Sequence, residues 1–402
     1  MQRITYRVKV SAKGAKRRIS YLLRPSKRLL NTKSNIVTSV TPTRQSRFVR
    51  TKKLAQVSSI ALLSPPAESL ISMGAPVAAY DNVMLEKTLT VAAVPGNSTY
   101  FATDGFQHGF GYDLVRTYAD ELGVDVDLKA YANEKAALKA VKSGAADMAL
   151  TTASTKMKSQ LNLSSVNVSC GYDATLTNNG LHPKVSWTFN SANDPLSQKA
   201  SYFLCDSIKL ENTHKLAAFY NQNLLKDAYS QDHLQKTLTE TLPEYQSSFE
   251  EQARNYNHDW ELLVAMGYQE SHLDANAVSP TGVRGLMMLT NNTAKAMGVS
   301  DRVDPYQSIG GGARYLEQMK DDFADVPKSD RIWFALAGYN MGPNAVKGIQ
   351  RKLREQGIND KSWANVYAYL AENRASNSRY GQAMHYVSNI RSYLETIKTQ
   401  TV

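Results

Sequence analysis

Residues 259–290 read DWELLVAMGYQESHLDANAVSPTGVRGLMMLT, and this stretch decides the fold of the second half of the chain. Its first part, 259–271, has the period of an amphipathic helix. Glu270 falls on the apolar face, where a charged carboxylate is costly unless it is paired or its pKa rises. A raised pKa suits a general acid near neutral pH. The plain alternative is a Glu that points to solvent from a fraying helix end. The face consists of Leu263, Met266, Gly267 and Glu270.

Two later segments repeat this arrangement. Residues 329–341 and 380–397 have apolar stripes at helical spacing, with Asn340 and Tyr386 on the striped faces. A buried Tyr is ordinarily a core residue, and an Asn at a helix end is ordinarily a cap. We predict that the three helices bring their polar groups to one cleft. The helix expected at 309–323 has the pattern of plain core.

The remainder of the opening stretch, 276–290, contains the Pro and Gly residues of a turn that allows close backbone approach to a ligand. Four motifs follow one another in this half of the chain: YQESHLDANAVSPTGVRGLMMLT, DPYQSIGGGARYL, WFALAGYNMGP and GQAMHYVSNIRSYL. Together they resemble the lytic transglycosylases of goose-lysozyme type over residues 243–402. The resemblance implies an all-α, lysozyme-like (SLT) domain that acts on peptidoglycan glycan strands.

The resemblance also implies roles for single residues. Glu270 would be the only catalytic acid/base, and Met288 would have no polar role. Ser271 would orient Glu270 or the substrate, and Tyr386 would support the reacting sugar. The substrate-binding residues implied in this way are Ser271, Gly285, Leu286, Met287, Tyr339, Asn340 and Tyr386.

The implied reaction is cleavage of the β-1,4 bond between N-acetylmuramic acid and N-acetylglucosamine, which leaves 1,6-anhydro ends. One carboxylate suffices because the substrate's N-acetyl group can stabilise the developing charge. Asp274 is the nearby second carboxylate, and we interpret it as a loop cap. If it were catalytic, a water-using muramidase would be the better description, and an idle peptidoglycan-binding or partner-binding scaffold is a further alternative. His258, His272 and His385 lack metal-ligand spacing, so we expect no metal and no cofactor.

The first half of the chain has a different pattern. Apolar runs at 88–94, 124–130 and 146–151 predict strands, and the segments between them predict helices that end at Gly123 and Gly144. This alternation predicts an α/β domain with a parallel sheet and right-handed crossovers.

The order GFQHGFGYDLVRTYADELGV…EKAALKAVKSGAADMALTTAS resembles the first lobe of a periplasmic solute-binding domain. Residues 85–225 are too few for the two lobes between which such a domain holds its ligand. Lys156 lies near the position where the family often has a ligand-binding Arg, but Lys lacks the planar fork of Arg. We therefore expect a scaffold that positions its neighbour, with a muropeptide or protein partner as the open alternative.

The charge is concentrated at the N-terminus. The chain has a net charge of +11, yet residues 1–67 contain 16 basic and no acidic side chains, which leaves 31 basic and 36 acidic ones for the rest. This distribution argues against a folded nucleic-acid-binding domain, and we expect no nucleic-acid partner. Residues 57–64 and then Val77-Ala78-Ala79 are similar to the apolar and cleavage regions of a secretory signal. A transit peptide, a start codon assigned too far upstream and a plain basic tail fit the composition as well.

We expect a periplasmic protein with a signal within residues 1–79, and peripheral outer-membrane association is left open. The uncharged stretch 54–67 is shorter than the roughly 20 apolar residues that a membrane span needs. Cys170 and Cys205 can form one disulfide or remain two thiols. The expected organisation is a basic arm (1–84), a shortened solute-binding-like α/β domain (85–225), a linker (226–242) and the catalytic domain (243–402).

Overall fold

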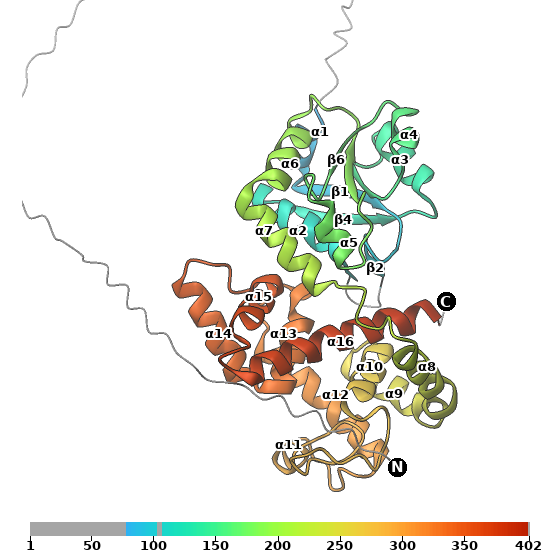
Figure 1. Cartoon of the computed structure of the whole chain (residues 1–402), viewed down its shortest axis with the longest axis vertical. Coiled ribbons are helices and arrows are strands. Elements are labelled where there is room, and N and C mark those ends of the chain that lie inside the picture. The colour runs from blue at the N-terminus through green and yellow to red at the C-terminus, as the bar shows by residue number, and fades with distance from the viewer. Residues whose placement is uncertain (1–77, 103–106, 401–402) are drawn as a thin grey trace, which may run out of the picture. The chain divides into compact units, whose positions relative to one another are not determined.

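The computed structural model describes residues 78–102 and 107–400 of the 402-residue chain (Figure 1). The basic arm up to residue 77, with its candidate signal, lies outside the described residues. The last part of the expected arm belongs to a helix, α1 (Ala79–Glu86). The backbone amides of Ala79 and Tyr80 donate to the carboxylate of Asp194, which holds the start of this helix against the first part of the fold.

The first part contains a five-stranded mixed sheet in the order β4-β1-β5-β7-β6. β1 pairs in parallel with β4 and β5, as the sequence predicts, whereas β7 pairs antiparallel with β5 and β6. A short hairpin, β2 (Phe101–Ala102) and β3 (Gln107–His108), lies outside this sheet. The strands of the main sheet are β1 (Thr88–Ala93), β4 (Asp125–Ala130), β5 (Met148–Thr151), β6 (Ser164–Asn167) and β7 (Ser186–Phe189).

Helices cover both faces of this sheet because alternate residues of its strands point to opposite sides. Ala92 and Ala149 pack with Leu138 of α3, whereas Val91 and Leu150 belong to the larger core on the other side. Gly123 and Gly144 end α2 and α3 in the left-handed region, as predicted. The helices of this part are α2 (Phe110–Leu122), α3 (Glu134–Ser143), α4 (Thr155–Ser159), α5 (Asp173–Asn178), α6 (Pro195–Cys205) and α7 (Ser207–Phe219).

Cys170 and Cys205 form a disulfide, which decides between the two alternatives that the sequence left open. The bridge ties the segment after β6 to the end of α6, and it closes a loop of 35 residues. Such a cross-link limits the freedom of the unfolded chain.

The second part is helical, as the four motifs imply. Residues 226–242, expected to be a linker, are themselves largely helical: α8 and a π-helical turn, Thr237–Thr241, lead directly into α9. Leu234 of α8 is buried, so this polar segment has an apolar anchor. The helices are α8 (Ala228–Lys236), α9 (Leu242–Tyr256), α10 (Trp260–Ser271), α11 (Asn291–Ala296), α12 (Pro305–Asp322), α13 (Lys328–Met341), α14 (Pro343–Glu355), α15 (Trp363–Asn373) and α16 (Ser378–Gln400).

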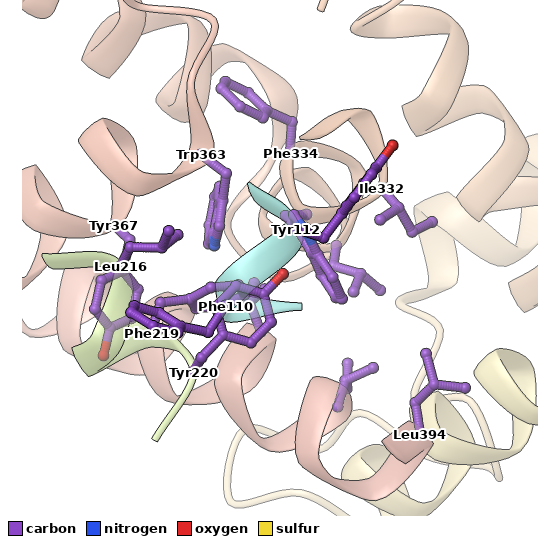
Figure 2. Close-up of a cluster of buried hydrophobic side chains, with 14 of the residues drawn as sticks. Phe110, Tyr112, Leu216, Phe219, Tyr220, Ile332, Phe334, Trp363, Tyr367 and Leu394 are labelled. Atoms are coloured by element: carbon purple, nitrogen blue, oxygen red, sulfur yellow. The ribbon is translucent and has the colours of Figure 1, made fainter. Parts of the chain in front are cut away.

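The α/β part and the helical part share one hydrophobic core (Figure 2). Aromatic side chains of α2 and the end of α7 pack against side chains of α13, α15 and α16. The ring of Phe219 meets the rings of Trp333 and Trp363 edge to face, at centroid distances of 5.4 and 5.8 Å. The labelled members in Figure 2 are Phe110, Tyr112, Leu216, Phe219, Tyr220, Ile332, Phe334, Trp363, Tyr367 and Leu394. Within the described residues, none of the helices has both the length and the apolar character needed to cross a membrane.

Candidate active site

Glu270 lies in the last turn of α10, and its position follows from the two ends of that helix. Asp259 caps the N-terminus by accepting from the backbone amides of Glu261 and Leu262, at 3.1 and 3.3 Å. The helix stops at His272, which has a φ of 55°. The carboxylate of Glu270 is thus held near a helix end and is only partly exposed.

Tyr386 of α16 reaches the same point from the opposite side. Its hydroxyl donates a hydrogen bond of 2.6 Å to Oε1 of Glu270. Helices α10 and α16 run antiparallel, since Lys398 near the end of α16 pairs with Asp259 at the start of α10, at 2.8 Å. The predicted convergence of Glu270 and Tyr386 is therefore present as a direct contact.

The surroundings of Glu270 favour a proton on its carboxyl group. Burial raises the pKa of Glu270 to about 7, and the hydroxyl of Tyr386 acts in the opposite direction. A carboxyl group with such a pKa is protonated in a large fraction of molecules near neutral pH, yet it ionises readily. It can therefore give up a proton and take one back, as a single acid/base must.

Tyr339 of α13 completes the polar lining around Glu270. Its ring is nearly parallel to that of Tyr386, with the centroids 6.5 Å apart. Burial, and next the charge of Glu270, raise the pKa of both tyrosines well above the ordinary value. Both hydroxyls thus stay protonated and act as donors. Asn340 follows Tyr339 and is exposed at the end of the helix.

The turn that follows α10 is fixed by side chains of three helices, α10, α12 and α13. The hydroxyl of Ser271 donates to the carbonyl oxygen of Leu286 at 2.8 Å. The hydroxyl of Tyr339 donates to the carbonyl oxygen of Met287 at 3.0 Å, and the amide of Met287 donates to the hydroxyl of Ser308 in α12 at 3.0 Å. The side chains of Leu286 and Met287 are completely buried. Within this turn, they support the site from the core rather than lining it.

Gly285 is required by the geometry of this turn. Its φ is 92°, and a Cβ added to it would lie 1.9 Å from the carbonyl oxygen of Arg302. The guanidinium of Arg302 in turn donates to the carbonyl oxygen of Leu289 at 2.9 Å. Sequence reasoning missed Ser308 and Arg302. Ser308 lies within the quoted motif DPYQSIGGGARYL, which could have drawn attention to it.

Asp274 does not join the site. It is exposed, and its Oδ1 accepts from the backbone amide of Asn276 at 2.8 Å, which is the turn-capping contact expected for it. Lys156, the residue near the ligand-binding position of solute-binding domains, is exposed on α4. In the part of the chain that the structure describes, no three His, Cys, Asp or Glu side chains are grouped so that they could hold a metal ion.

Comparison with known proteins shows which protein family the helical part resembles. Residues 247–362 match the family described as the transglycosylase SLT domain. The match lies within the helical part, from α9 to the segment just before α15, and this region is similar to a transglycosylase SLT domain. The chain is also similar to proteins called membrane-bound lytic murein transglycosylase F.

Three of these relatives show how far the similarity extends. The protein from Shewanella pealeana is 44% identical over 172 residues (40% of this chain and 36% of the relative). The protein from Klebsiella pneumoniae is 48% identical over 162 residues (38% and 31%). The protein from Stutzerimonas stutzeri is 34% identical over 272 residues (65% and 54%). The last match is longer than the helical part, so it also includes residues of the α/β part. This chain spans about half the length of these relatives or less.

Proposed function

We propose that the protein is a lytic transglycosylase that cleaves the β-1,4 bond between N-acetylmuramic acid and N-acetylglucosamine in murein and leaves 1,6-anhydro ends. The observation that carries the proposal is the pair of Glu270 and Tyr386, a carboxyl group with its pKa raised to about 7 and a buried hydroxyl 2.6 Å from it. The SLT domain and the name that the relatives bear support it.

Glu270 would act twice in this reaction. It first gives its proton to the glycosidic oxygen, while the N-acetyl oxygen of the muramic acid attacks C1 and the bond to the leaving sugar breaks. The carboxylate then takes the proton of the 6-hydroxyl, whose oxygen attacks C1 and displaces the N-acetyl oxygen. Glu270 ends in its starting state, and no water is consumed, so the reaction is that of a lyase.

The two tyrosines and the turn would support these steps. Tyr386 stabilises the carboxylate after its proton has left, because a hydrogen bond to the charged form favours that form. Tyr339 keeps the turn at Met287 in place, and Ser271 holds the same turn through Leu286. Asn340 is exposed beside Tyr339, where its amide is available to the substrate.

Digestion of purified murein sacculi with the full chain tests the proposal. Products with anhydro ends, detected by mass, are expected from the wild-type protein, and Glu270→Gln should release none. Products with reducing ends would instead indicate a muramidase. Sacculus binding with no product from either protein would indicate an idle scaffold.

We also propose that the chain divides into a basic N-terminal arm, a solute-binding-like α/β domain that includes α1 and extends to residue 225, and the catalytic domain (243–402), into which α8 leads, and that it works in the periplasm. The disulfide between Cys170 and Cys205 supports this compartment, because disulfides persist in oxidising surroundings. A signal within residues 1–79 would direct the export, and association with the membrane would be peripheral. Sequencing the N-terminus of the protein from its native cell tests the export signal, since a retained residue 1 would contradict export by cleavage.

A further inference from the structure

The helix that carries Tyr386 also carries a buried ion pair, which the proposed reaction does not use. Arg391 and Glu395 of α16 are 0 and 5% exposed, and Nη1 of Arg391 donates to Oε2 of Glu395. Burial alone would raise the pKa of Glu395, but Arg391 and His108 outweigh it, and the pKa lies below the ordinary value. The pair is therefore ionised inside the protein.

The remaining partners of this pair belong to the α/β part. Nη2 of Arg391 donates to the carbonyl oxygen of Asn221 at 2.8 Å, and its guanidinium lies over the rings of Phe219 and Tyr220 at 5.6 and 5.3 Å. Figure 2 shows these two rings beside α16 in the shared core. The cation is thus held by hydrogen bonds and by two aromatic faces.

Glu395 is held by the same part of the chain. Nε2 of Gln222 donates to its Oε2 at 3.2 Å, and Nε2 of His108 in β3 lies 3.4 Å from its Oε1. A buried charge that loses its partner is strongly destabilising, so the position of α16 is firmly set by these contacts.

The ion pair and Tyr386 lie on opposite sides of α16. Arg391 and Glu395 follow Tyr386 by five and nine residues, which places them about 140° and 180° around the helix. One side of the helix therefore contacts Glu270, and the other side is held by the α/β part. Since the outer atoms of a helix lie about 5–6 Å from its axis, a rotation of about 15° would move the hydroxyl of Tyr386 by roughly 1.5 Å. A site tolerates displacements of only about 0.5 Å.

We propose that Arg391 and Glu395 are positioning residues of the active site, which fix the rotation of α16 against the α/β part so that Tyr386 keeps its hydrogen bond to Glu270. The α/β part is then a structural component of the catalytic centre. The inference rests on the proposed function only for its kinetic readout.

A second contact of the same kind reaches the other helix of the site. Nη2 of Arg116 in α2 lies 2.5 Å from Oδ2 of Asp330 at the start of α13, the helix that carries Tyr339 and Asn340 in its last turn. Oδ1 of Asp330 accepts from the amide of Trp363 at 3.0 Å. Both helices that bring tyrosines to Glu270 are thus tied to the α/β part by charged side chains, buried at α16 and partly buried at α13.

The test is made on the full chain with Glu395→Gln, which keeps the shape of the side chain and removes its charge. Gln222→Met is the milder variant, since it removes one donor from the α/β side. Leu138→Ala is the matched control. Leu138 of α3 is fully buried in the separate, smaller hydrophobic cluster and is not part of the ion pair. Each variant is compared with Tyr386→Phe and with the double variant Tyr386→Phe/Glu395→Gln.

Two readouts separate positioning from mere stability. The first is the pH dependence of the turnover rate on sacculi, and the second is the pKa of Glu270 from its carboxyl carbon resonance, assigned with Glu270→Gln. The groups that face Glu270 are Tyr386 from α16 and Tyr339 from α13, with Tyr315 of α12 behind Tyr339 at a ring distance of 4.9 Å. The measured change in the pKa of Glu270 therefore reports mainly on the hydroxyl of Tyr386.

We expect Glu395→Gln to lower the turnover rate by about 10- to 100-fold and to raise the pKa of Glu270 in the direction of Tyr386→Phe. Gln222→Met should raise the pKa of Glu270 by a smaller amount. In the double variant the pKa of Glu270 should be no higher than in Tyr386→Phe. Leu138→Ala should lower only the melting temperature. An unchanged pKa in folded Glu395→Gln and Gln222→Met, or additive shifts in the double variant, would overturn the inference. A wild-type protein without anhydro products would overturn the proposed function alone, because the resonance measurement needs no activity.

Discussion

Removal of a single hydroxyl, Tyr386→Phe, gives the most informative change at the site. The hydroxyl donates to Oε1 of Glu270 at 2.6 Å, and the ring is buried, so Phe keeps the packing and deletes only the donor. A hydrogen bond to a charged group contributes about 1.5–3 kcal/mol. Since one pKa unit corresponds to about 1.4 kcal/mol, the pKa of Glu270 should rise by roughly one to two units.

The sign of the effect follows from which form the hydroxyl stabilises. Tyr386 lowers the pKa of Glu270 against the larger effect of burial, so its removal moves the pKa upward from about 7. The first step needs the protonated acid, and the rate therefore falls as the pH rises through this pKa. In Tyr386→Phe the fall in the rate should occur at higher pH than in the wild-type protein. The maximum rate should be lower, because the carboxylate of Glu270 has lost its hydrogen bond from the hydroxyl.

The assay is the rate of release of soluble products from sacculi between about pH 5 and pH 9, at saturating substrate. Tyr339→Phe is the matched control, because the hydroxyl of Tyr339 donates to the carbonyl oxygen of Met287 and not to Glu270. In Tyr339→Phe, the rate should fall with rising pH at nearly the same pH as in the wild-type protein. If the rate of Tyr386→Phe falls at the same pH as that of the wild-type protein, the role assigned to the hydrogen bond between Tyr386 and Glu270 is refuted.

Further variants test the energetics of the fold and the assignment of the carboxylate. Glu270→Gln should be more stable than the wild-type protein by about 1–3 kcal/mol at pH 8, and the difference should vanish near pH 4. The wild-type protein loses this stability between the ordinary pKa of a Glu and the raised pKa of Glu270, because in that range the unfolded chain is ionised while the folded one still holds the proton. Chemical unfolding at both pH values measures the difference. Gly285→Ala should destabilise by more than about 2 kcal/mol, since its Cβ would meet a backbone carbonyl oxygen at 1.9 Å, and an unchanged melting temperature would contradict this geometry. Asp274→Asn should retain nearly full turnover, because the amide oxygen can still cap the turn, and a loss of 100-fold or about that size would favour a two-carboxylate mechanism. Replacing Cys170 and Cys205 together by Ser should cost about 2–4 kcal/mol of stability without altering turnover, as measured by unfolding and by product release.

The helices of the site could be predicted from local pattern, but their meeting point could not. The apolar period around Glu270 and Tyr386 predicts the two helices and which face of each is buried. The contact between the two side chains depends on how α10 and α16 cross, which is decided by packing far away in the sequence. The quoted motifs supplied this information only through a resemblance to a family.

Other features escaped sequence reasoning for identifiable physical reasons. Residues 226–242 are polar and were expected to form a linker, yet the single buried Leu234 anchors α8 to the fold. The antiparallel strand β6 (Ser164–Asn167) has only four residues and little apolar character. Arg391 and Glu395 have the composition of a solvated helix face, and only the neighbouring α/β part shows that they are buried.

The central claim is that Glu270 drives a cleavage in which the muramic acid's own 6-hydroxyl replaces water. Digestion of sacculi in water enriched in oxygen-18 tests this claim most directly. The account predicts products one water molecule lighter than hydrolysis products, without the heavy isotope, and none from Glu270→Gln. Products that carry one oxygen-18 at C1 would contradict it.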